Sequence, residues 1–184
     1  MSDLYDLFHE RATGAGAEVY RVAGCQEARE RLTAILRELD ARQVVAVRSP
    51  LLEVLDLDEV ARHSAARVSY GDWRTTAVEA DVGISELDFA LAETGTLVQD
   101  ATDIGKRLVS MLPPVHIALV RAETILPSLR QMMGYWTQKE AVPGYIAFIT
   151  GPSRTADIER VLTIGVHGPG RLIVLCVDGG EGNR

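Results

Sequence analysis

Two kinds of hydrophobic pattern alternate along the chain. In some segments apolar residues recur every three or four positions, which predicts an amphipathic helix. The clearest of these spans residues 26–41. Other segments are short, continuous apolar runs, which predict buried strands. Strands are expected at residues 18–22, 44–47, 66–70, 116–120, 145–150 and 171–177.

The order of these patterns predicts the fold class. Continuously apolar strands separated by helices are typical of a mainly parallel sheet that helices cover on both faces. Further helices are expected after Ser49-Pro50, over 125–136 and over 156–162. Residues 88–100 differ, because two runs about Thr94-Gly95 predict an inserted β-hairpin. The sequence therefore predicts an α/β fold, with residues 1–184 forming one domain.

Composition narrows the classes of function. The chain has 184 residues, of which 47% are hydrophobic and 24% charged, as in ordinary soluble proteins. The net charge is −7 and the basic residues are scattered, which argues against nucleic acid as a partner. No run approaches 18 apolar residues, and the N-terminus mixes acidic with apolar residues. We therefore expect no membrane partner, no signal peptide and a cytoplasmic location.

Cysteines and histidines are few. Cys25 and Cys176 are far apart and belong to no Cys-x-x-Cys pair, so thiolates alone cannot hold an iron–sulfur cluster or a structural zinc. Cys176 is expected to be a small buried side chain. The four histidines are also dispersed, and we predict neither a metal nor another cofactor. A homo-oligomer is compatible with the sequence.

The first group of candidate residues lies where the strand expected at 145–150 ends. Parallel sheets bind ligands outside the carboxyl ends of their strands, and helix N-termini favour anions, so an arginine with two hydroxyls here predicts an anion site. The alternative is a capped helix start whose arginine points to solvent. The residues concerned are Gly151, Ser153, Arg154, Thr155 and Asp157.

The second group forms the expected hairpin turn, Glu93, Thr94, Gly95 and Thr96. A carboxylate among apolar neighbours can have a raised pKa and act as an acid, a base or a nucleophile. Alternatively, Glu93 closes the turn through backbone hydrogen bonds, and Gly95 supplies a positive φ.

The third group combines a cation with turn residues. Arg107 is a candidate cation, and His116 lies at the mouth of a predicted strand. His167 and Gly168 lie in a glycine-rich turn that a ligand could approach closely. A lone histidine is more often a structural group than a metal ligand. Ser153 does not lie in a Gly-x-Ser-x-Gly turn, so no nucleophilic triad is predicted.

Three of these stretches occur together in a recognisable order. They are ADVGISELDFALAETGTLV (80–98), RLVSMLPPVHIALV (107–120) and GPSRTADIERVLTIGVHGP (151–169), and the strand at 171–177 follows them. In this order they closely resemble the LUD-domain family. The N-terminal third matches that family only in its rhythm of strands and helices.

The resemblance implies a fold similar to that of sugar-phosphate isomerases, glucosamine-phosphate deaminases and CoA transferases. It also implies a setting, because family members accompany iron–sulfur subunits that oxidise L-lactate to pyruvate. This chain lacks a ferredoxin-like cysteine run, so it is not expected to carry electrons.

Three functions follow from these observations. The first is an accessory component of lactate oxidation that binds a small anionic metabolite in a cleft formed by residues 93–96, residues 153–157 and His167. The second is an enzyme acting on a CoA ester or a sugar phosphate through Glu93, because similar CoA transferases use a glutamate in a Glu-x-Gly turn. The third is a scaffold for the iron–sulfur subunits, in which residues of the 125–136 helix form a contact face unless they belong to its core. Those residues are Met132, Met133, Tyr135 and Trp136.

Overall fold

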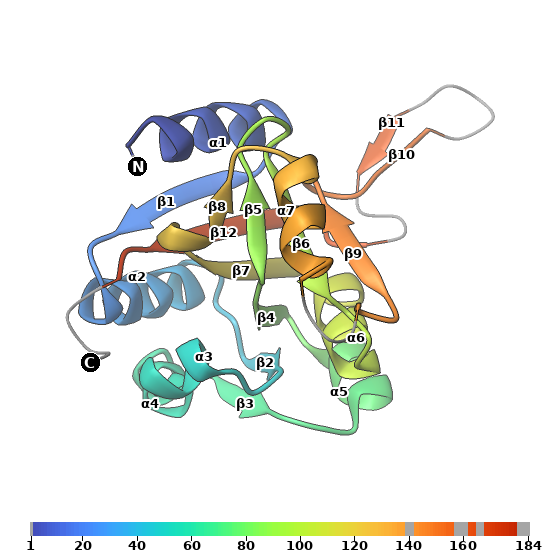
Figure 1. Ribbon diagram of the computed structural model, residues 1–184. Coiled ribbons are helices and arrows are strands. Elements are labelled where there is room, and N and C mark those ends of the chain that lie inside the picture. Colours follow the sequence, from blue (N-terminus) through green and yellow to red (C-terminus); the bar gives the residue numbers. More distant parts are fainter. Residues whose placement is uncertain (1, 139–141, 157–161, 165–167, 180–184) are drawn as a thin grey trace.

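Six parallel strands form the central sheet, in the spatial order β1-β12-β7-β4-β2-β3 (Figure 1). The computed structural model describes residues 2–138, 142–156, 162–164 and 168–179. Every neighbouring pair in this sheet is parallel, which confirms the predicted class. The strands are β1 (Glu18–Val22), β2 (Gln43–Ala46), β3 (Arg67–Ser69), β4 (Val82–Glu86), β7 (Val115–Arg121) and β12 (Arg171–Val177).

Three helices cover one face of this sheet: α2 (Cys25–Glu38), α3 (Pro50–Val54) and α4 (Leu57–His63). The predicted apolar face of α2 is buried against the strands. The helix predicted after Ser49-Pro50 is divided into α3 and α4. Asp56, in the left-handed conformation at φ 46°, separates them, and its side chain accepts a hydrogen bond from the amide of Glu59.

A second, four-stranded sheet shares the opposite face with helices α1 (Ser2–Gly14), α5 (Trp73–Glu79) and α6 (Ile104–Met111) (Figure 1). Its order is β8-β5-β6-β9. The predicted hairpin is confirmed as the antiparallel pair of β5 and β6, which the turn at Gly95 (φ 66°) joins. The strands are β5 (Phe89–Leu91), β6 (Thr96–Asp100), β8 (Ile125–Leu126) and β9 (Ile146–Ile149).

Two predictions for the C-terminal half are wrong. The strand expected at 145–150 is β9, which pairs antiparallel with β6 instead of joining the parallel sheet. Both ends of the helix expected at 156–162 are strands, because β10 (Arg154–Ala156) pairs antiparallel with β11 (Leu162–Ile164). The β-branched residues of these short segments favour strands. No helix therefore begins at Ala156 to present its N-terminus to an anion.

Helix α7 (Leu129–Trp136) packs on the outer face of the second sheet. Met132 and Trp136 are buried there, with Phe89 against the ring of Trp136. Met133 and Tyr135 are 44% and 51% exposed. The helix therefore has a core side and an exposed apolar side.

Gly83 permits the close approach of α6 to the central sheet. A Cβ built on Gly83 would overlap the carbonyl oxygen of Val109, a backbone atom that cannot move aside. We expect Gly83→Ala to lower the free energy of unfolding by roughly 2–3 kcal/mol, in the range of overpacked cores.

Gly134 is the matched control, because a Cβ there meets nothing within 4 Å. Gly134→Ala should raise the free energy of unfolding by roughly 0.5–1 kcal/mol, through helix propensity. Denaturant unfolding measures both variants. Equal stabilities for the two variants would contradict the close approach of α6.

Candidate functional site at the carboxyl ends of the strands

A crevice of about 360 Å³ opens where the chain connections diverge at the carboxyl ends of β2, β4 and β7. Strand β2 leads outward to β3, whereas its neighbour β4 leads to β7 on the other side. Open α/β sheets bind ligands at such a switch point. The lining residues are Val47, Arg48, Ser49, Pro50, Ser85, Glu86, Leu87, Asp88, Gln99, Lys106, Arg121 and Thr124.

Glu86 ties the rim of the crevice together. One carboxylate oxygen pairs with Nε of Arg121 at 3.1 Å, which joins the ends of β4 and β7. The other accepts a hydrogen bond from the amide of Leu51 at 2.9 Å, which fixes the start of α3. Both oxygens are therefore occupied, and the charge of Glu86 is balanced by that of Arg121.

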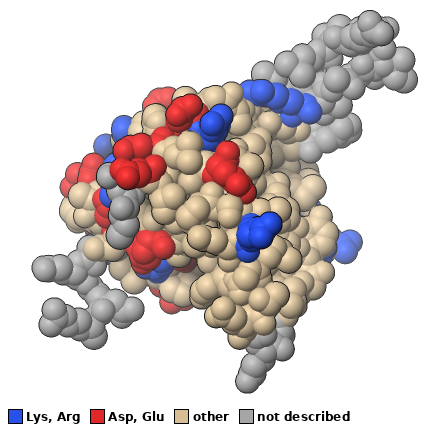
Figure 2. Space-filling view, turned by 45° about the horizontal axis from the view of Figure 1, so that its top comes forward, with Lys and Arg blue, Asp and Glu red and all other residues tan. Residues whose placement is uncertain are grey.

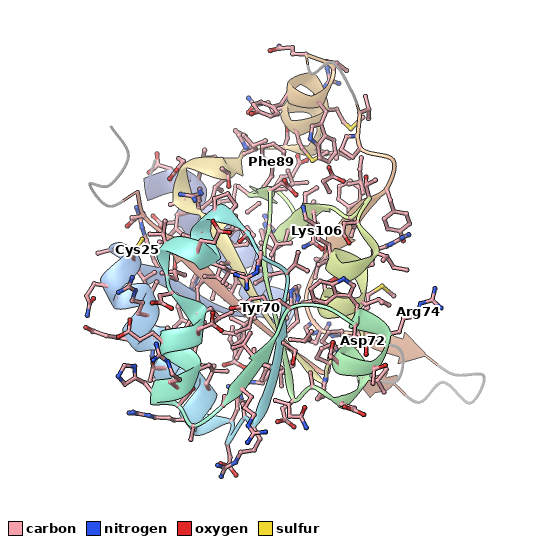
Figure 3. The ribbon with its side chains drawn as sticks, turned by 90° about the horizontal axis from the view of Figure 1, so that it is seen from below. Cys25, Tyr70, Asp72, Arg74, Phe89 and Lys106 are labelled. Atoms are coloured by element: carbon pink, nitrogen blue, oxygen red, sulfur yellow. The ribbon has the colours of Figure 1, made fainter. Side chains whose placement is uncertain are left out.

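Within the part of the chain that the structure describes, Lys106 is a cation without a partner. It lies in the first turn of α6, where Asp103 caps the helix by accepting from the amide of Gly105 at 2.6 Å. Figure 3 shows Lys106 on the inner side of α6, whereas Arg74 on α5 points outward. Lys106 is partly buried as a residue, and its ammonium has no hydrogen bond or ion pair among the described residues. It is therefore available to an anion in the crevice.

Two further charged groups, Asp88 and Arg48, lie at the edge of the crevice. Asp88 uses one carboxylate oxygen to accept from the amide of Asp100 at 2.6 Å, and no partner for its other oxygen lies among the described residues. The guanidinium of Arg48 lies 4.2 Å from the ring centroid of Tyr70. Burial raises the pKa of Tyr70 to about 12, so Arg48 faces a neutral ring.

Buried polar groups form the floor. Gln99 lies on β6 and is fully buried, yet in the described part of the chain neither its amide oxygen nor its amide nitrogen has a hydrogen-bond partner. Ser85 Oγ and Nε2 of His116 share a hydrogen bond of 2.8 Å, and both side chains are buried. Desolvation lowers the pKa of His116 to about 4, so its ring is neutral at physiological pH.

The hairpin residues predicted from the sequence pack against other backbone segments. The carboxylate of Glu93 accepts a hydrogen bond from the amide of Leu129 at 2.8 Å, at the start of α7. Thr94 is exposed at the turn, and Gly95 presses against the backbone of α1. The hydroxyl of Thr96 bonds that of Thr150 at 2.7 Å.

The Gly-Pro-Ser-Arg-Thr segment lies near the amino ends of the parallel strands, not at their carboxyl ends as expected. Gly151 packs on the carbonyl of Ala15, which also accepts from Arg154 at 2.7 Å. The amide of Ser153 donates to Pro169, beside Gly168. Thr155 lies in β10.

Of the remaining predicted residues, Arg107 is described by the structure and does not line the crevice. The guanidinium of Arg107 lies 4.8 Å from the ring centroid of Tyr145. Asp157 and His167 lie outside the described residues. The two predicted segments do meet near the end of α1, but the side chains of Glu93 and Arg154 bind different backbone groups.

Comparison with known families decides what kind of domain this is. The model of the LUD domain matches residues 5–177. The chain belongs to the LUD domain family. The resemblance noted in the sequence is thereby confirmed.

Relatives of this LUD domain include several proteins named lactate utilization protein C. The one from Halalkalibacterium halodurans is 34% identical over 156 residues, which cover 78% of this chain and 66% of that protein. Those from Macrococcus caseolyticus and Bacillus subtilis are both 46% identical, over 107 and 98 residues. These two matches cover 55% and 50% of this chain, and 46% and 40% of the relatives. The matched part thus spans 40–66% of the relatives' length.

A crystal structure supports the fold. The DUF162 family protein from Deinococcus radiodurans superimposes with a TM-score of 0.68, at 23% identity. The match covers 97% of this LUD domain and 98% of that chain.

A second cavity, of about 440 Å³, lies between α2 and α4. Two of its cations already donate to backbone carbonyls, Arg29 to Val54 and Arg37 to His63. It lies on outer helices and away from the strand ends. The crevice at the switch point is therefore the better candidate site of this LUD domain.

Two classes of feature are absent from the part of the LUD domain that the structure describes. It contains no cluster of three or more histidine, cysteine or acidic side chains that could hold a metal ion. Within the same residues, no helix combines the length and apolar character that crossing a bilayer requires.

Sequence reasoning missed Ser85, Glu86, Asp88, Gln99 and Lys106. A signal for three of them was present, because the run Val-Gly-Ile at 82–84 continues directly into Ser-Glu-Leu-Asp. A short apolar run followed by acidic residues is typical of a buried strand that ends at a site. Gln99 and Lys106 carry no such signal.

The neutral state of His116 predicts a pH-dependent stability. Its pKa is about 4 in the folded protein and 6.5 in the reference state, so only the unfolded chain takes up a proton between these values. The contribution of the neutral His116 ring to the free energy of unfolding is complete above pH 6.5. It is lost as the pH falls toward 4. Between pH 7.5 and 5 the wild type should lose roughly 2 kcal/mol more than His116→Gln. Urea unfolding at both pH values tests this, and parallel losses would show that His116 does not titrate as described.

Proposed function

We propose that this LUD domain is an accessory component of L-lactate oxidation to pyruvate and that it binds a small anionic metabolite in the crevice. The names of its relatives support the setting. The crevice lies at the switch point of the sheet, which supports it as the binding site. Its volume is in the range of about 300–1,000 Å³ typical of small-molecule sites.

The observation that carries the proposal is the unpartnered ammonium of Lys106. An ammonium that no carboxylate holds can pair with an incoming anion without breaking an existing interaction. Arg121 is already held by Glu86, and Arg48 lies over Tyr70. Lys106 is thus the cation that an incoming carboxylate or phosphate can pair with at the lowest cost.

The sequence points to a different location for the anion, around Arg154. That guanidinium donates to the carbonyl of Ala15, so an anion there would have to compete with an existing hydrogen bond. Lys106 and Arg154 lie near opposite ends of the parallel strands. Variants at these two positions therefore separate the two locations.

Replacement of Lys106 should weaken anion binding. We expect Lys106→Met to weaken the affinity for the bound metabolite at least about tenfold, because the charge-assisted contact is lost, and Arg154→Ala to leave the affinity unchanged. Calorimetric titration with L-lactate, pyruvate, CoA esters and sugar phosphates provides the measurement. The reverse order of effects would move the site to Arg154, and silence of the wild type toward every compound would refute anion binding.

A second function, docking to iron–sulfur subunits, has its own structural support. Figure 2 shows a broad area with few charges on one side of the molecule. Large apolar side chains of α7 and β9 are about half exposed: Leu129, Met133, Tyr135 and Phe148. Exposed apolar surface of this kind is typical of a protein-interaction site. We propose that this surface, termed the α7 face, contacts those subunits.

A charge on the α7 face should reduce partner capture. We expect Met133→Glu to lower the recovery of the iron–sulfur subunits at least about tenfold, because a carboxylate would be buried in an apolar contact. Val78→Glu, on α5 and 67% exposed, is the control and should bind normally. Trp136 is unsuitable as a probe because it is buried, and its loss would unfold the domain. Equal recovery of both variants in pull-down would exclude the α7 face.

A further inference from the structure

The amide of Gln99 is the most unusual polar group in the crevice. The side chain is completely buried between the two sheets, and neither Oε1 nor Nε2 has a hydrogen-bond partner among the described residues. Its neighbours on β6, Leu97 and Val98, are buried apolar residues. Gln99 also lines the crevice, so its buried side chain borders the space that a ligand would occupy.

An unpaired buried amide destabilises a fold. The large majority of buried polar side-chain atoms in proteins have a hydrogen-bond partner, and those that lack one require an explanation. Nothing in the packing of β6 requires an amide, because an apolar residue of similar volume would suit the surrounding core. The partner of Gln99 is therefore expected to come from a molecule bound in the crevice.

Three free groups then define the chemistry of that molecule. Lys106 supplies hydrogen-bond donors and a positive charge, which suit an anionic group. Asp88 has a carboxylate oxygen with no partner among the described residues, and this oxygen can only accept. Gln99 both donates and accepts. A hydroxyl group satisfies either of the last two, because it donates and accepts through one oxygen.

From these groups we infer that Gln99 determines the specificity of the crevice and that the ligand is a hydroxylated carboxylate or phosphate. This inference rests on the proposed function, since it assumes that Lys106 binds the anionic group. Gln99 then selects the hydroxyl, because its buried amide, unlike the partly exposed carboxylate of Asp88, cannot be satisfied by solvent. A deoxy analogue would leave the Gln99 amide buried and unpaired, so it should bind more weakly.

Matched ligand pairs test the selection. Calorimetry would compare L-lactate with propionate, and glycerol 3-phosphate with propyl phosphate. In at least one pair, the hydroxylated compound should bind the wild type at least about tenfold more tightly. If the two compounds of every pair that binds have equal affinities, the inference is overturned and the proposed function stands. Absence of binding in both pairs would overturn the inference, whereas the proposed function fails only if pyruvate, CoA esters and sugar phosphates do not bind either.

Variants of Gln99 identify the residue responsible. Gln99→Met should remove the preference for the hydroxylated compound while leaving the affinity for its deoxy partner within about twofold, since Lys106 is intact. Gln131→Met, on the exposed side of α7, is the matched control and should retain the preference. Retention of the preference in Gln99→Met would overturn the assignment.

Thermal unfolding without ligand separates this role from a structural one. Removal of an unpaired buried amide should leave the melting temperature of Gln99→Met at or above that of the wild type. A clear fall in melting temperature would show that an ordered water or the protein itself already satisfies the amide, and the inference would then fail.

Discussion

The carboxylate of Glu86 holds three parts of the fold in a fixed relation. It joins the end of β4 to β7 through Arg121 and to the first turn of α3 through the amide of Leu51. The ion pair is partly exposed and adds little stability by itself, but the hydrogen bond to Leu51 is charge-assisted and fixes a position. Because Glu86 is held by Arg121 and by the amide of Leu51, it does not pair with Lys106. The charge that the crevice presents to a ligand thus depends on the carboxylate of Glu86.

The second sheet supplies the floor on which the proposed specificity depends. Gln99 faces the central sheet because the β5–β6 hairpin pairs in one register, with Leu91 opposite Thr96. A shift of one residue along β6 would turn Gln99 toward α7 and bring an apolar neighbour into the crevice. The Thr94-Gly95 turn, which joins the two strands, therefore helps to place Gln99 in the crevice. Glu93 supports the same arrangement by accepting a hydrogen bond from the amide of Leu129.

The sequence predicted those features that depend on local pattern. Continuous apolar runs identified β2, β7 and β12, and the threonine–glycine turn identified the hairpin. The run of β9 is equally apolar, but apolar character does not specify which strand is the partner, and β9 pairs with β6. The site could not be predicted in the same way. Whether Lys106, Gln99 or Arg154 has a partner depends on contacts with residues far away in the chain, which periodicity does not report.

The pairing of β1 with β12 has a consequence for how the molecule forms. Among the described residues, β1 is an edge strand of the central sheet and pairs with β12, the strand of that sheet that comes latest in the sequence (Figure 1). During synthesis, β1 can therefore pair with β12 only after about residue 177 has emerged from the ribosome. Until then the edge of β1 that later pairs with β12 is open to chaperones and to other nascent chains, so β1 depends on protection during translation.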